Sequence, residues 1–191
     1  MKKSVIAALA LSLMLMAGAA SASVIGIFGD QGALNCTANM TAQYTTVPVY
    51  FLAQLDDIGA MSACEFGASG VNLTGMAIAT VAWNTTLVIG DIMTPDGVAL
   101  AFTTPLDAPL AYLGSISYFL LAAVPADHAM EVVPSGAGNI LVVDADTAAE
   151  IPAAGWSCIV NCTPGGVYGS CQCQDGIATE DATWGQIKAL Y

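Results

Sequence analysis

The chain has 191 residues, of which 56% are hydrophobic and only 9% are charged, and its formal net charge at pH 7 is −12. It has three Lys or Arg residues against 15 Asp or Glu residues. Proteins bind nucleic acids and anionic membrane surfaces through Lys and Arg side chains that neutralise phosphates, so this balance excludes both kinds of partner. Few residues remain for the polar face of amphipathic helices, whereas Thr, Ser, Asn and Gly can form the solvated face of a sheet. The composition therefore predicts an all-β protein.

Residues 1–22 have the layout of a secretory signal peptide. Two lysines precede an apolar run from Val5 to Ala20, and the small-residue cleavage site Ala20-Ser21-Ala22 closes it. We expect the mature chain to begin near Ser23 and to work as a secreted, extracellular or cell-surface protein, with the periplasm as the alternative. Later apolar runs are interrupted by Gly, Pro, Asp or Asn, so no membrane span is predicted after cleavage.

Residues 23–146 are predicted to form one β-sandwich domain. Short apolar runs rich in β-branched and aromatic residues recur there, and turn residues such as Pro95-Asp96-Gly97 separate them. The pattern predicts about nine strands, over Val24–Phe28, Thr46–Gln54, Ala60–Phe66, Gly75–Ala82, Thr86–Ile92, Gly97–Thr103, Ala111–Leu121, His128–Val133 and Asn139–Val143.

Two of these strands carry a readable pattern of side chains. From Val47 to Leu55 the odd-numbered residues are apolar and are predicted to share the buried face, and Pro48 favours a sheet edge or the start of the strand. From Leu113 to Leu121 apolar residues occur at both odd and even positions. That strand is predicted to be buried on both faces and to lie near the middle of a sheet.

Residues 147–191 are predicted to form a cysteine-rich loop and a C-terminal segment that packs on the sandwich or trails it. Four of the six cysteines stand close together among Gly, Pro, Ser and Gln, so crosslinks have to hold this stretch. The last residues, from Ala182 to Tyr191, predict a short helix with Thr183 as its N-cap.

All six cysteines are predicted to form disulfides, because an exported chain meets an oxidising environment. Cys36 and Cys64 stand apart from the others, which favours a Cys36–Cys64 bridge. The other four then pair as Cys158–Cys171 with Cys162–Cys173, or as the swapped pairs, and the sequence does not choose between these. A four-cysteine zinc site is the alternative, but the C-x-C spacing of the last two cysteines suits a zinc knuckle poorly.

No catalytic residue is predicted. His128 is the only histidine, and neither a G-x-S-x-G motif nor a second histidine accompanies it. Glu65 stands inside an apolar strand, where the expected role of its side chain is to face solvent. No cofactor is required by any motif, although calcium is a candidate, because hard cations bind loop carboxylates such as those of Asp144, Asp146 and Glu150.

Trp83 and Trp156 are the candidates for stacking on a carbohydrate ligand. Each is followed by a polar residue and is predicted to lie in a loop, where an indole ring remains accessible. The alternative for both residues is a place in the core or at its edge.

The order of the predicted strands resembles that of a known family. The segments Val47 to Leu52, Cys64 to Phe66, Leu113 to Phe119 and Ile140 to Asp144 follow one another as in the nine-stranded jelly roll of cohesins and carbohydrate-binding modules of bacterial extracellular proteins. The likeness covers Val24 to Asp144 and implies the sandwich architecture, with no binding residue carried over. The chain departs from cohesins in its cysteine-rich tail and in having no partner dockerin segment.

These observations favour a noncatalytic β-sandwich that binds a protein or carbohydrate surface or mediates extracellular assembly. A carboxylate-dependent glycoside hydrolase is the first alternative, and it requires a cleft with two facing acids and exposed aromatic rings. A self-assembling surface or fibre subunit is the second, and it requires unpaired edge strands or an apolar patch.

Overall fold

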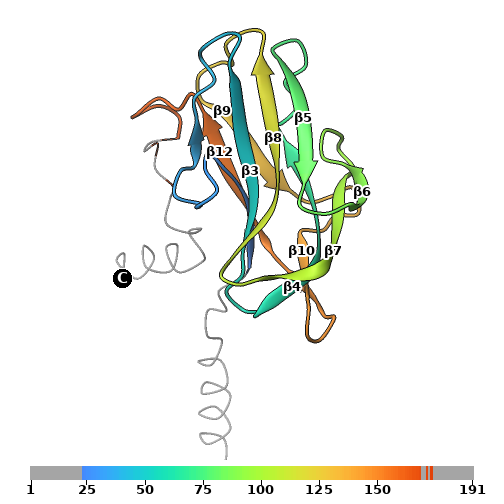
Figure 1. Ribbon diagram of the computed structural model, residues 1–191. Helices are drawn as coiled ribbons and strands as arrows, with labels where there is room; N and C mark the ends of the chain where they lie inside the picture. The colour runs from blue at the N-terminus through green and yellow to red at the C-terminus, as the bar shows by residue number, and fades with distance from the viewer. Residues whose placement is uncertain (1–22, 169–170, 172, 174–191) are drawn as a thin grey trace, which may run out of the picture. The chain divides into compact units, whose positions relative to one another are not determined.

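The computed structural model describes residues 23–168, 171 and 173, which fold as an all-β sandwich (Figure 1). No helix in this part of the chain is long and apolar enough to cross a membrane. The predicted signal peptide and C-terminal helix lie outside the described residues. The strands are β1 (Val24–Phe28), β2 (Thr37–Ala38), β3 (Thr46–Gln54), β4 (Ala60–Ser69), β5 (Ala77–Trp83), β6 (Leu87–Asp91), β7 (Gly97–Asp107), β8 (Leu110–Leu120), β9 (His128–Val133), β10 (Leu141–Asp144), β11 (Glu150–Pro152) and β12 (Ala154–Val160).

The strands form two layers. One is the sheet β12-β1-β3-β8-β5, and the other is the sheet β11-β10-β4-β7-β6. Strand β9 joins them, because it pairs with the end of β4 on one side and with β12 on the other. All nine predicted strands are confirmed, which leaves β2, β11 and β12 as the strands that the sequence did not predict.

Strand β12 carries the sandwich past its predicted end at residue 146. It pairs in parallel with β1 and antiparallel with β9, so it lies inside the sheet. Cys158 and Val160 on this strand are fully buried. The segment therefore belongs to the core of the domain, and not to the loop that the sequence predicts there.

Aromatic rings from three strands fill the space between the sheets. Phe51 on β3 lies 5.6 Å from Phe66 on β4 and 5.3 Å from Trp83 on β5, measured between ring centroids. The alternation predicted for β3 is confirmed, since Val49, Phe51 and Ala53 are all fully buried. Pro48 lies near the start of that strand, beyond the residues of β3 that pair with β1, where a missing backbone donor is tolerated.

Strand β8 lies inside its sheet, between β3 and the edge strand β5, and only one of its faces is buried. The pairing of β8 with β3 skips Leu113, which creates a β-bulge. Up to and including the bulge, odd-numbered residues such as Ala111 and Leu113 point to the core, and after it even-numbered residues such as Ile116 do. Phe119, on the opposite face, is 39% exposed. This change of phase at the bulge explains why apolar residues occur at both odd and even positions of the strand.

The cysteines pair differently from the expected arrangement. The structure joins Cys36 to Cys173 and Cys162 to Cys171, and it leaves Cys64 and Cys158 as buried free thiols. The Cys162–Cys171 bridge belongs to the swapped arrangement. The Cys36–Cys64 bridge does not form because β4 turns Cys64 into the core, whereas Cys36 precedes β2, which pairs with β12 and so lies near the C-terminal cysteines.

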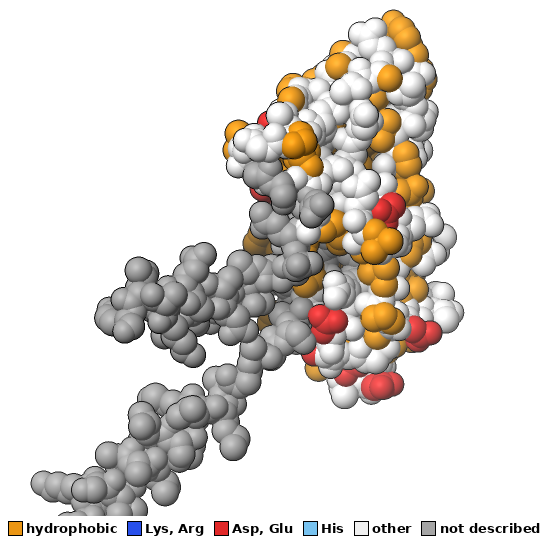
Figure 2. Space-filling model, turned by 90° about the vertical axis from the view of Figure 1, so that its left-hand side faces the viewer, with side chains coloured by type: hydrophobic (Ala, Val, Ile, Leu, Met, Phe, Trp, Pro, Cys, Tyr) orange, Lys and Arg blue, Asp and Glu red, His pale blue; other side chains and the backbone are white. Residues whose placement is uncertain are grey.

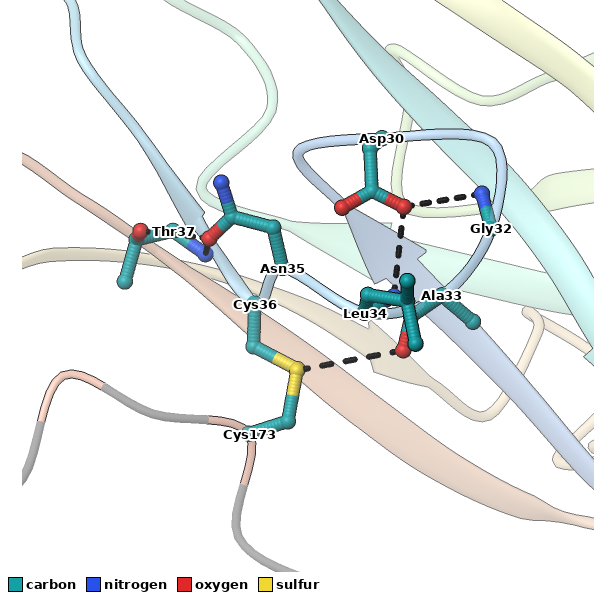
Figure 3. Close-up of a disulfide and its surroundings, with 8 residues drawn as sticks. All are labelled: Asp30, Gly32, Ala33, Leu34, Asn35, Cys36, Thr37 and Cys173. Carbon is teal, nitrogen blue, oxygen red and sulfur yellow. Dashed lines mark hydrogen bonds between the residues drawn. A yellow bond between two sulfur atoms is a disulfide. The ribbon is translucent and has the colours of Figure 1, made fainter.

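Figure 3 shows how a short loop presents Cys36 to the tail. The carboxylate of Asp30 accepts hydrogen bonds from the backbone nitrogens of Gly32 (2.8 Å) and Leu34 (3.2 Å), which fixes the turn after β1. The Sγ atom of Cys173 lies 4.0 Å from the carbonyl oxygen of Ala33 in this turn. The disulfide therefore holds residue 173 against the start of the domain.

Candidate binding face

The outer face of the sheet β11-β10-β4-β7-β6 carries two rows of mostly apolar side chains that run across the strands. We call these eight residues the apolar face. Residues paired across neighbouring strands stand side by side on one face of a sheet. The pairing gives one row of Leu141, Glu65, Ala99 and Ile89, and a second row of Val143, Ala63, Ala101 and Leu87.

These side chains point outward because their neighbours along each strand point inward. Cys64 on β4, Leu100 on β7 and Val142 on β10 are almost fully buried in the core. Successive residues of a strand face opposite sides of the sheet, so the residues on either side of each buried one must face out. The sequence of β7 from Val98 to Phe102 is apolar at every position for this reason, with one set of residues for the core and one for the surface.

The apolar face is hollowed along its centre. The inner strands β4 and β7 contribute the small side chains Ala63, Ala99 and Ala101, and larger side chains on β6 and β10 rise on either side. The resulting groove has a volume of about 500 Å³. On its β6 side, Leu87 is 51% exposed and Ile89 is 78% exposed. Large exposed side chains around a small-residue floor form a surface that excludes water once a complementary partner covers it.

Two carboxylates line the groove, Glu65 within the first row and Glu150 beside Val143 of the second. The hydroxyl of Ser135 donates a hydrogen bond to Oε1 of Glu65. Ser135 is itself buried, and its Oγ atom accepts a hydrogen bond of 3.2 Å from the backbone nitrogen of Ala137. The loop after β9 therefore fixes the position of Glu65 on the face.

The part of the chain that the structure describes holds no Lys or Arg, because all three of these residues lie outside it. On the side of the molecule that Figure 2 draws, red carboxylates lie among orange hydrophobic side chains and no blue Lys or Arg side chain is seen. The carboxylates that line the groove thus have no cation partner within the described residues, so the site combines apolar side chains with two carboxylates.

Neither predicted stacking residue lies in a loop. Trp83 is the last residue of β5 and packs edge-on against Phe66, with the ring centroids 6.2 Å apart. Trp156 lies within β12 and stacks on Phe28 at 6.2 Å. Both tryptophans therefore pack at the margins of hydrophobic clusters, and their predicted role in carbohydrate stacking has no support in these contacts.

The predicted calcium ligands do not converge. The carboxylate of Asp144 accepts hydrogen bonds from the hydroxyl of Thr147 and from the backbone nitrogen of Asp146 (3.1 Å). These bonds lower the pKa of Asp144, the hydroxyl most of all. Within residues 23–168, 171 and 173, no three His, Cys, Asp or Glu side chains gather where they could hold a metal ion. Asp144 therefore stabilises a turn.

His128 has a structural contact. Its Nε2 atom donates a hydrogen bond of 2.7 Å to the carbonyl oxygen of Gly70, since a carbonyl can only accept. Gly70 has a φ of +70°, a conformation that glycine adopts without steric cost. The imidazole thereby holds the turn that follows β4, which gives His128 a structural role.

The features that a glycoside hydrolase requires are divided between two pockets. The carboxylates of Glu65 and Glu150 line the groove of the apolar face, where none of the lining residues is aromatic. A second pocket contains Trp83 and Phe102, and the residues described as lining it include no carboxylate. This division favours a binding surface over a hydrolytic cleft.

Solved structures with a similar fold include cohesin modules. A chain from a CaDoc0917–CaCohA2 complex at pH 5.5 is 14% identical with a TM-score of 0.44, and the match covers 74% of this chain and 99% of that one. The cohesin module from the Clostridium perfringens ATCC13124 family 33 glycoside hydrolase is 8% identical with a TM-score of 0.43, over 74% and 98% of the two chains. A non-cellulosomal cohesin from the hyperthermophilic archaeon Archaeoglobus fulgidus is 10% identical with a TM-score of 0.35, over 73% and 91%. No family model and no curated protein matches the sequence. The chain thus bears a weak resemblance to cohesin modules.

Proposed function

We propose that this chain is a noncatalytic protein-binding module and that the apolar face is its binding surface. The observation that carries the proposal is the pair of rows across β10, β4, β7 and β6, in which every outward side chain except that of Glu65 is apolar. A soluble sheet normally presents polar residues on its outer face. An exposed face of this kind is typical of an interaction site.

The chemistry of the groove defines its partner. The floor of Ala63, Ala99 and Ala101 leaves room for an inserted apolar ridge, and Leu87 and Ile89 can pack along its side. Glu65 and Glu150 favour Lys or Arg at the margins of that ridge, since neither carboxylate has a cation partner within the described residues. We therefore propose a partner with an apolar ridge flanked by basic side chains. Charge attraction of this kind mainly accelerates association and selects the partner.

We also propose that the module works outside the cytoplasm. Two disulfides stabilise the chain between residues 36 and 173, and such crosslinks persist in oxidising compartments. The signal peptide predicted for residues 1–22 supplies the route of export. A purified secreted form that begins near Ser23, identified by mass spectrometry, is the expected result, and an uncleaved chain with reduced cysteines would contradict it.

A synthetic amphipathic helix with a leucine ridge and lysine flanks tests the binding surface. We expect saturable binding by calorimetry, with NMR shift changes confined to β4, β6, β7 and β10. The substitution Ala101→Glu fills the floor of the groove with a charged side chain and should weaken binding roughly tenfold or more, because burial of an unpaired charge opposes association.

Thr103→Glu is the matched control. Thr103 lies two residues further along β7, on the same outward face, and is exposed beyond the two rows. The Thr103→Glu substitution adds the same charge as Ala101→Glu and should leave the binding affinity within about twofold of that of the unsubstituted chain. Equal losses in the two variants, or shift changes on the sheet β12-β1-β3-β8-β5, would exclude the apolar face as the binding surface.

A further inference from the structure

Strand β5 forms one end of the sheet β12-β1-β3-β8-β5 (Figure 1). It pairs with β8 along its full length, from Ala77 opposite Leu120 to Trp83 opposite Gly114. No strand of the described chain pairs with its other side. An edge of this kind offers a row of backbone groups to another strand.

Two hydrogen bonds establish which residues offer those groups. The backbone nitrogen of Leu121 donates to the carbonyl of Met76 (2.8 Å), and that of Asn84 donates to the carbonyl of Leu113 (2.8 Å). In an antiparallel ladder such hydrogen-bonded pairs alternate along the strand. The even-numbered residues of β5 therefore bond to β8, and the backbone groups of Ala79 and Val81 point to the open edge, whereas the backbone nitrogen of Ala77 donates to the carbonyl of Leu73 (3.0 Å).

The sequence of β5, Ala77-Ile-Ala-Thr-Val-Ala-Trp83, contains no charged residue and no proline. Proteins usually protect an edge strand with Lys, proline or a bulge that prevents pairing with another chain. The other free edges of this domain follow that rule or are very short, since β6 ends in Gly90-Asp91, β11 contains Glu150 and Pro152, and β2 has only 2 residues. Strand β5 is the exposed edge that lacks such protection among the described strands.

The distribution of charge around β5 differs from that of the other layer. None of the strands β12, β1, β3, β8 and β5 contains Asp, Glu, Lys or Arg. The other sheet carries carboxylates on β4, β6, β7, β10 and β11. Two copies of this acidic chain can therefore approach edge to edge through β5 without placing carboxylates directly opposite each other.

We infer that β5 is the surface through which a second copy of this chain binds, by antiparallel pairing of the two β5 strands about a twofold axis near Thr80. Ala79 of one copy then lies opposite Val81 of the other, so the outward-pointing groups of both strands bond to each other. Ile78 (58% exposed) and its neighbour Phe119 on β8 extend the contact over the outer face. An isologous interface uses both edges and ends at a dimer. This inference does not depend on the proposed binding function of the apolar face.

The first test uses sedimentation equilibrium of the oxidised protein with Thr80→Asp and Thr103→Asp as a matched pair. Both threonines are exposed on strands, and the two substitutions add the same charge. Thr80→Asp places like charges opposite each other at the axis and should weaken dimerisation roughly tenfold or more, whereas Thr103→Asp should change it by less than about twofold. Added salt should strengthen the unsubstituted dimer, because it screens the repulsion between the two acidic chains.

Ala79→Pro is the second test. The backbone nitrogen of Ala79 points to the open edge, so a proline at this position removes no bond to β8 but blocks pairing with a second strand. We expect a monomer with an unchanged pattern of β-sheet circular dichroism. A chain that is monomeric at every concentration and salt level overturns the inference. Equal dimerisation of all the variants, or an equal loss in Thr80→Asp and Thr103→Asp, overturns it as well.

Discussion

The two sheets of this domain share one core but present different outer faces. On the inner side both contribute large buried side chains, such as Phe51 from β3 and Phe66 from β4, which contact each other. On the outer side, the sheet β11-β10-β4-β7-β6 presents the apolar face with its flanking carboxylates. The sheet β12-β1-β3-β8-β5 carries no charged residue on any strand. The shared core thus holds the domain together, whereas the two outer faces differ in what they offer to partners.

The largest expected effect tests the shared core. Phe51→Ala should lower the free energy of unfolding by about 3–5 kcal/mol, because it removes a fully buried ring and leaves a cavity between the sheets. Phe119→Ala is the control on the outer face, where the ring is 39% exposed, and it should cost less than about 1 kcal/mol. Urea denaturation measures both, and similar losses would contradict the assignment of the two faces.

Removal of the Cys36–Cys173 bridge tests how much this crosslink contributes to the stability of the domain. Paired Cys→Ser substitutions at these positions should cost about 2–4 kcal/mol, because the bridge closes a loop with a sequence separation of 137. Removal of Cys162–Cys171, with a separation of 9, should cost less. Thermal unfolding of both double variants, each compared with the oxidised chain, checks the order, and the reverse order would contradict it.

The buried thiols predict a loss of stability at alkaline pH. Burial raises the pKa of Cys158 to about 12 and also raises that of Cys64. In the unfolded chain both thiols ionise near pH 8.5, so above that pH the unfolded chain binds fewer protons than the folded one. Each thiol should then lower the free energy of unfolding by up to about 1.4 kcal/mol per pH unit, until the pH reaches the folded pKa.

Urea denaturation between pH 8 and 11 measures this slope. The Cys64→Ala/Cys158→Ala variant is the control, because its stability should depend less steeply on pH over the same range. A thiol titration adds a second check, since both groups should react only after unfolding. An unchanged slope in the variant would contradict the role of the thiols.

The strands were predictable from the sequence because turns with Gly, Pro and Asp separate them, and Val24–Phe28 and Thr46–Gln54 have the predicted bounds. Strand β12 was missed because its apolar residues lack a clear period, and its partners β1 and β9 are distant in the sequence. The Cys36–Cys173 bridge was missed for a related reason. The pairing of β2 with β12 brings Cys36 near the C-terminal cysteines, and only the three-dimensional fold shows it.

The apolar face was less visible in the sequence. Continuous apolar runs such as Leu87-Val88-Ile89 suit a strand buried on both sides as well as one with an exposed apolar face. The distinction requires knowing that no further layer covers these strands within the described chain. The useful signal was the small size of Ala99 and Ala101 beside large residues on the neighbouring strand, which becomes apparent once the register of β6 and β7 is known.

The smallest expected effect concerns stability at the apolar face. Leu87→Ser and Ile89→Ser should each change the free energy of unfolding by no more than about 0.5 kcal/mol, because both side chains are largely exposed. Val88→Ser lies between them and packs against the core, so it should cost about 1–3 kcal/mol. If the two outward variants instead destabilise the domain as much as Val88→Ser does, the rows of the apolar face serve the fold. If they keep the stability but abolish binding of the leucine-ridge peptide, the rows serve the partner.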